Sequence, residues 1–398
     1  MSNKILVIII IAIVLRLAMV FLLPDFAGPD ERDHYDYVKY LYQQRSLPVD
    51  TFQDSRGEFF QAPLYYLMLL PGFALSHHQP LWLSLRVLRL FNVALAGVVI
   101  WLVYLTVRQA FPTRRGRDLG AAAFAAFHPV YVRNSCAVNN DNLLILLCCL
   151  LFYRLLAVDT AKNSLKNNFG TGLLLGLGIL TKTSMVAMIP VVILIGIWPQ
   201  EGGTKPLSRL VGLAITFGVA ALTGGLWLAR NYFLYHNAMG MGLSWPRNAD
   251  PFTLAFQLYS AKHAFVTFWR TLAGGRERMV WDIFKWPWLG LNLLATVGCL
   301  SLLKDVLRNR SMKSLRNEVA MCVLVASFVA AGWLFGMKYG KGIHGFFDGR
   351  LIFPAMTGLG LLFAAGVQRL LPQPIAEKMW IMESILFITT SAILLLIL

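Results

Sequence analysis

Long apolar runs, separated by short polar segments, organise this chain. The first run, Ile5–Leu23, directly follows Lys4. A helix needs about 20 mostly apolar residues to cross a bilayer, so the pattern predicts an all-α integral membrane protein with about 11 transmembrane helices. The predicted spans are 5–23, 86–110, 119–132, 142–158, 169–181, 184–198, 210–229, 286–303, 318–337, 351–370 and 379–398. The first run is long for a signal-peptide core and no small-residue cleavage site follows it, so we interpret it as an uncleaved helix.

Two longer polar segments, 24–85 and 232–285, are predicted to be loops on the non-cytoplasmic side. Within the first, Ala62–Leu75 has only 14 residues and contains two prolines. It is too short to cross the membrane comfortably, so we expect an interfacial or re-entrant piece within that long loop, which is predicted to contain interfacial helices. The pattern predicts a single transmembrane domain, 1–398, with no soluble C-terminal domain.

Charge supports this topology. The chain carries 36 Lys and Arg but only 20 Asp and Glu, and 57% of its residues are hydrophobic. Each short loop that this topology places in the cytoplasm carries Lys or Arg, which is the usual inside bias. The prediction is a plasma or inner membrane protein with a cytoplasmic N-terminus. The net charge of +16 is assigned to topology and to anionic membrane lipids, and no basic, aromatic-rich soluble segment indicates nucleic acid.

The candidate chemistry lies at the predicted outer face. Pro29-Asp30-Glu31-Arg32-Asp33-His34-Tyr35 follows the first span, and Asp30 and Glu31 are adjacent carboxylates. Ionisable clusters at a membrane boundary are either functional or ordinary solvated loop residues. Other polar groups fall at the outer ends of later spans: Asp141, Lys182, Arg230, His344, Asp348 and Arg350. Asp141 could instead be the N-cap of the helix that follows it.

Seven short motifs occur in order along the chain: PDExxHY, APLYYL, RxxN from Arg89, NNDN, GLLLGLGILTKTS, WLARN and GRLIFP. In this order they resemble the GT-C-type glycosyltransferases of the protein O-mannosyltransferase and aminoarabinose–lipid A transferase group. The chain departs from that pattern at Gln61-Ala62-Pro63, where the family often has His or Lys before two prolines. This departure leaves the acceptor open, as does the absence of a soluble C-terminal domain.

The resemblance implies transfer of a sugar from a polyprenyl-phosphate donor to a lipid, glycan or protein acceptor on the non-cytoplasmic face. Such a reaction needs a base for the acceptor and cations for the departing phosphate, and a single displacement inverts the anomeric carbon. Asp30 matches the family's first acid and is predicted to be the base, with Glu31 positioning the acceptor or holding a cation, although their roles could be exchanged.

The other candidates are predicted to bind substrate. Lys182, Arg230 and Arg350 suit the phosphate, and His34 and Tyr35 would orient the acids or contact sugar. Arg89 would either pair with an outer-loop acid or contact substrate. No resident cofactor is predicted with certainty, and a divalent cation is left open.

The alternative is a transporter or flippase of a lipid-linked sugar, in which the same charges line a pathway. A transporter is expected to place polar residues at both membrane faces and to show internal symmetry, and the sequence shows neither.

Overall fold

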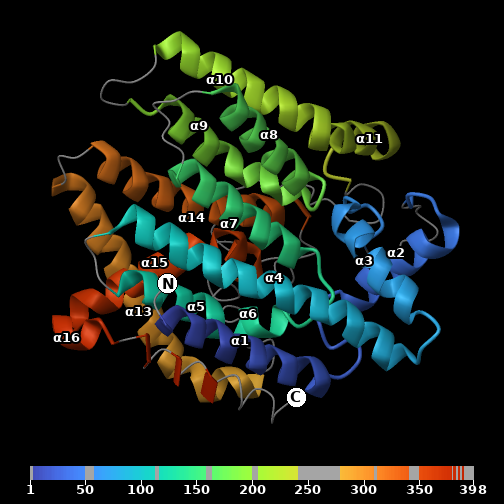
Figure 1. The fold of residues 1–398 in the computed structure, drawn as a ribbon, viewed down its shortest axis with the longest axis horizontal. Coiled ribbons are helices and arrows are strands. Elements are labelled where there is room, and N and C mark those ends of the chain that lie inside the picture. Colours follow the sequence, from blue (N-terminus) through green and yellow to red (C-terminus); the bar gives the residue numbers. More distant parts are fainter. Residues whose placement is uncertain are drawn as a thin grey trace. The chain divides into compact units, whose positions relative to one another are not determined.

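The computed structural model describes residues 3–49, 58–112, 116–157, 164–199, 205–240, 278–308, 312–339 and 349–378, with a few positions between 380 and 389. Over these residues every regular element is helical (Figure 1), which confirms the all-α prediction. The chain divides into two compact units. The first comprises Met1–Leu102 and Val132–Ser244, and the second comprises Val103–Tyr131 and Trp245–Leu398.

Five of the described helices are long and apolar enough to cross a membrane: Asn3–Leu22, Leu81–Ala110, Pro206–Tyr235, Lys313–Leu334 and Arg350–Leu370. Each coincides with a predicted span, so this is an integral membrane protein. The shorter spans appear as α7 (Asp141–Ala157), α8 (Leu165–Ile179) and α9 (Ile189–Ile197). The total of about 11 stays a prediction, and the last span, 379–398, lies mostly outside the described residues.

The first long polar segment holds two helices. The segment predicted to be interfacial or re-entrant forms α3 (Leu64–Ser76), and α2 (Glu31–Gln44) precedes it. The acids Glu31 and Asp33 lie in the first turn of α2, where negative charges interact favourably with the helix dipole. Its buried side chains pack against α3 in one aromatic-rich core that includes Tyr37, Val38, Tyr66 and Phe73. This packing holds the acidic motif at the start of a fixed helix.

Other helices complete the first unit. α1 (Asn3–Leu22) leads into the acidic motif, and α4 (Leu81–Ala110) begins in this unit. A continuous helical stretch is formed by α10 (Pro206–Ala220), the π-helical turn η2 (Ala221–Gly225) and α11 (Leu226–Tyr235). It packs closely on α8. The contact at Gly176 is so close that an added Cβ would collide with Thr223. The π-helical turn lies at this crossing with α8.

The second unit contains the remaining helices: α5 (Arg117–Phe127), α13 (Arg278–Arg308), α14 (Met312–Tyr339), η4 (Gly349–Ala355), α15 (Met356–Leu370) and α16 (Gln373–Ala376). Here α15 packs against both α13 and α5. The span predicted at 119–132 is broken into α5 and a short α6 (Pro129–Asn134). The break falls at His128, because the residue before a proline is biased away from helical geometry.

Candidate active site

Asp30 lies immediately before α2 and is exposed. Its backbone is left-handed, with φ 55° and ψ 16°, and its side chain makes no cap hydrogen bond to the helix. Asp is one of the few residues that tolerate this conformation, and it persists only where the surroundings hold it. The carbonyl of Asp30 accepts the backbone N–H of His34 at 3.1 Å. The carboxylate is therefore presented to solvent from a fixed turn.

Glu31, the adjacent acid, points into the protein. Arg89 donates to both of its oxygens, from Nε to Oε1 and from Nη2 to Oε2, each at 2.8 Å. Neither side chain has exposed surface. The backbone N–H groups of Gly28 and Val138 donate to the same carboxylate at 3.1 and 2.9 Å. With four hydrogen bonds Glu31 is fully engaged, so Asp30 is the accessible member of the pair.

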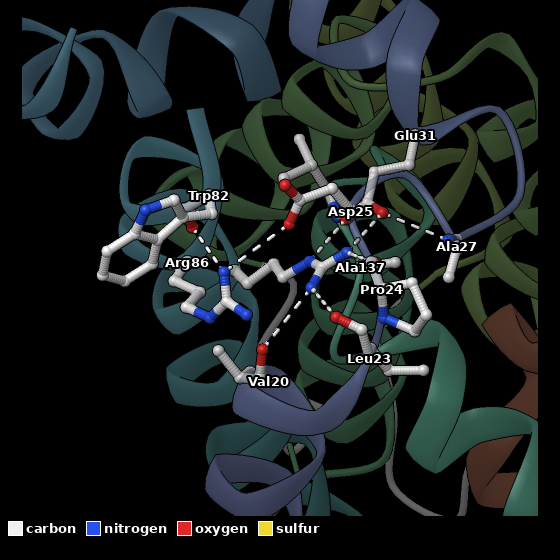
Figure 2. Close-up of polar contacts among 12 residues, drawn as sticks. Val20, Leu23, Pro24, Asp25, Ala27, Glu31, Trp82, Arg86 and Ala137 are labelled. Atoms are coloured by element: carbon white, nitrogen blue, oxygen red, sulfur yellow. Dashed lines mark hydrogen bonds and ion pairs between the residues drawn. The ribbon is translucent and has the colours of Figure 1, made fainter. Parts of the chain in front are cut away.

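Arg89 also fixes the end of α1. It donates to the carbonyls of Leu23 at 3.1 Å and Pro24 at 2.8 Å, and lies 3.4 Å from that of Val20. Figure 2 shows these carbonyls and the Glu31 carboxylate gathered around one guanidinium group. Arg89 therefore pairs with an outer-loop acid, one of the two roles predicted for it. Because it is fully buried, it touches no ligand in this conformation.

His34 and Tyr35 belong to the packed side of α2. The Nδ1 atom of His34 lies 2.9 Å from the hydroxyl of Tyr66, and the two rings are stacked. Tyr35 contacts Phe26 and Phe73 edge-on. Both predicted site residues are buried and help to hold the first turn of α2, one turn after Asp30.

Asp141 and Lys182, 41 residues apart, form an ion pair with Nζ 2.6 Å from Oδ1. The alternative role considered for Asp141, N-cap of the following helix, is not the one that the structure shows. The backbone N–H of Asp141 donates to Oδ1 of Asn139 at 2.7 Å, so Asn139 supplies the capping oxygen. Asp141 begins α7, which leaves its carboxylate to pair with Lys182. Lys182 is extended between α8 and the 3-10 helix η1 (Thr183–Met188) and keeps 18% of its side chain exposed.

Arg230 on α11 is half-buried. Its guanidinium lies 4.4 Å from the centre of the Trp227 ring, and Nη2 donates to the carbonyl of Pro48 at 2.7 Å. The side chain thus joins α11 to the segment that follows α2. Arg350 belongs to the second unit, where it lies half-buried in η4. His344 and Asp348 lie outside the described residues.

Asp33, in the first turn of α2, provides a test of the local electrostatics. Burial raises its pKa above the usual value, and the neighbouring carboxylates of Asp30 and Asp36 raise it further. The folded state then binds this proton more tightly than the unfolded state, so stability falls as pH rises above about 3.9.

We expect Asp33→Asn to raise the melting temperature at pH 7, with the gain shrinking towards pH 4. Thermal unfolding in detergent at both pH values checks this; an unchanged or lower melting temperature at pH 7 would contradict it.

Comparisons with known proteins concern the fold. A family model described as dolichyl-phosphate-mannose-protein mannosyltransferase matches residues 62–227. A structure of ArnT from Cupriavidus metallidurans aligns over 96% of the chain at 14% identity and a TM-score of 0.59. An Archaeoglobus fulgidus oligosaccharyltransferase aligns over 98% at 15% identity, also with a TM-score of 0.59. The chain therefore has the same fold as these two proteins. No curated protein matches it by sequence.

The chain spans only part of the length of these proteins. It covers 62% of the ArnT chain and 52% of the oligosaccharyltransferase chain. The ArnT structure holds undecaprenyl phosphate. Archaeoglobus oligosaccharyltransferase structures hold zinc and sulfate, a tethered acceptor peptide, or an inhibitory peptide with a dolichol-phosphate.

Proposed function

We propose that this protein transfers a sugar from a polyprenyl-phosphate donor to an acceptor at the non-cytoplasmic face of the membrane, with inversion. The observation that carries the proposal is the exposed carboxylate of Asp30, set in a left-handed turn beside the buried Glu31. The GT-C fold supports it, because solved relatives hold undecaprenyl phosphate and a dolichol-phosphate.

In this mechanism Asp30 accepts the proton of the acceptor hydroxyl or amine as that atom attacks the anomeric carbon. The bond from that carbon to the phosphate oxygen breaks, and polyprenyl phosphate leaves as a stable anion, so no general acid is required. Glu31 and Arg89 act indirectly, by fixing the turn that carries Asp30. Lys182 and Arg230 supply positive charge for the phosphate. Arg350, His344 and Asp348 are proposed to bind substrate on the sequence alone.

A divalent cation does not fit the described residues well. Hard cations prefer carboxylate oxygens, but Glu31 is bonded to Arg89 and Asp141 to Lys182. No group of three or more His, Cys, Asp or Glu side chains gathers in the part of the chain that the structure describes. We derive no step through a metal ion.

The proposal is tested with purified protein in detergent and a panel of radiolabelled polyprenyl-phosphate sugars, with lipid, glycan and peptide acceptors. Transfer, or release of polyprenyl phosphate, is expected from the wild type. Donor binding without release, combined with movement of the labelled lipid across reconstituted vesicles, would overturn the proposal in favour of a flippase.

Lys182→Met should weaken binding of undecaprenyl phosphate by roughly 10-fold or more, since a hydrogen bond to a charged group contributes about 1.5–3 kcal/mol. The substitution keeps the length of the side chain and removes its charge. Equilibrium binding in detergent measures the effect, with Lys39→Met at an exposed position of α2 as the matched control.

Because Lys182→Met leaves the Asp141 carboxylate unpaired, the double variant Asp141→Asn/Lys182→Met separates the two effects. It should bind the donor as weakly as Lys182→Met if Lys182 itself holds the phosphate. Affinity within about twofold of wild type, well under 1 kcal/mol, would contradict the assignment.

A further inference from the structure

The ion pair between Asp141 and Lys182 joins two segments that have little regular structure of their own. Residues 135–140 lie between α6 and α7, and Leu180–Lys182 lie between α8 and η1. Such segments do not define the position of a side chain by themselves. What holds them in place therefore decides where the ion pair sits.

Both segments are bound to the first turn of α3. The backbone N–H of Leu64 donates to the carbonyl of Leu180 at 2.9 Å. The hydroxyl of the next residue, Tyr65, accepts the backbone N–H of Asn139 at 2.8 Å. Between the two segments, Nδ2 of Asn140 lies 3.4 Å from the carbonyl of Thr181. One helical turn thus holds both sides of the ion pair.

The Tyr65 hydroxyl is itself fixed from a transmembrane helix. It donates to Oδ1 of Asn92 on α4 at 3.0 Å, and Nδ2 of Asn92 donates to the carbonyl of Ala137 at 2.7 Å. Tyr65 and Asn92 have no exposed surface. A tyrosine hydroxyl can donate once and accept as well, and Tyr65 does both here. Its oxygen therefore has one defined place relative to α4.

We infer that Tyr65 is a positioning residue whose hydroxyl, through the backbone of Asn139, sets the geometry of the Asp141–Lys182 ion pair. Phenylalanine at this position fills the same space but leaves the N–H of Asn139 without its acceptor in a buried site, which is costly. The segment before α7 then shifts, and the ion pair loosens. The effect on catalysis rests on the proposed function, but the effect on the ion pair does not.

The adjacent Tyr66 is a matched control. It is also fully buried on α3, but its hydroxyl contacts Nδ1 of His34 and its ring stacks on Tyr37 at 3.8 Å. Tyr65→Phe and Tyr66→Phe each remove one buried hydroxyl from the same helix. A general loss of stability would affect both variants alike, whereas loosening of the ion pair is specific to Tyr65→Phe.

The test measures the reductive methylation rate of each lysine by mass spectrometry in the intact protein. Lys182 should react about threefold faster in Tyr65→Phe than in wild type, approaching the rate in Asp141→Asn, because a loosened ion pair frees the amine. Tyr66→Phe should leave that rate at the wild-type level. An unchanged Lys182 rate in Tyr65→Phe, or an equal rise in Tyr66→Phe, overturns the inference. If Tyr65→Phe does not fold, Asn92→Ala takes its place, because it removes the acceptor that orients the Tyr65 hydroxyl. The same comparison of Lys182 methylation rates then applies.

Binding of undecaprenyl phosphate to the same variants then connects the ion pair to the proposed reaction. Tyr65→Phe should bind at least about fivefold more weakly than Tyr66→Phe, a difference of about 1 kcal/mol. If wild type binds no polyprenyl phosphate, the proposed function fails while the methylation result still decides the role of Tyr65. If wild type binds and Tyr65→Phe matches Tyr66→Phe, the positioning role fails alone.

Discussion

Asp30→Asn should lower the rate of sugar transfer by roughly 10²- to 10⁴-fold, the usual contribution of a general base. Asparagine tolerates the left-handed backbone of this turn nearly as well as aspartate, and the side chain is exposed, so the fold should be retained. Donor binding should be nearly unchanged, because the base acts on the acceptor. Initial rates with a saturating labelled donor, beside melting curves of the same preparations, measure both effects.

Asp36→Asn is the matched control for this experiment. It makes the same chemical change within α2, further along the chain, and should retain near wild-type rates. Transfer by Asp30→Asn at more than about one tenth of the wild-type rate would remove Asp30 as the base, since a tenfold effect is below what a general base contributes.

Arg89→Met should destabilise the protein by about 3–5 kcal/mol, the range for breaking a buried ion pair on one side. The substitution leaves the Glu31 carboxylate, which has no exposed surface, without its ion-pair partner. It also leaves the carbonyls of Leu23 and Pro24 without their hydrogen-bond donor. Thermal unfolding in detergent, followed by intrinsic fluorescence, measures the loss. Transfer should also fall at temperatures where the variant is still folded, because the turn that carries Asp30 is no longer anchored.

A neighbouring ion pair supplies the control. Arg86 lies 3.5 Å from Asp25, and both side chains are partly exposed; Figure 2 shows the pair beside the Glu31 site. Exposed pairs contribute only about 0–1 kcal/mol, so Arg86→Met should cost far less than Arg89→Met. The double variant Glu31→Leu/Arg89→Met should regain part of the loss, because it buries no unpaired charge. Equal costs for the two single variants would show that the Glu31 pair is not a structural anchor.

The two adjacent carboxylates differ in their surroundings. Asp30 lies in the left-handed turn before α2 and is exposed, whereas Glu31 is the first helical residue and is buried, so the two side chains face different ways. Glu31 faces α4 and Arg89, and Asp30 consequently faces outwards. The identity of the accessible acid follows from where Arg89 lies rather than from either residue alone.

The sequence by itself determined the features that depend on local composition. Apolar length predicted α1, α4 and α15 closely, because a bilayer requires about 20 apolar residues in each crossing helix. The same argument excluded α3 as a span, since it is too short and contains Pro71. The interruption at Lys182 was also predictable, because a charged residue between two short apolar runs disfavours one continuous helix in lipid.

Only the tertiary structure decided which polar groups meet. The N–H of Val138 that helps to hold Glu31 lies 107 residues away, and no local pattern specifies that partner. The same is true of the Tyr65 hydroxyl, which reaches the Asn139 backbone 74 residues away. Apolar length is a property of one segment, whereas a buried hydrogen bond requires two segments to be packed at a defined distance and orientation. The long apolar helices were therefore legible in the sequence, and the partners of its individual acids were not.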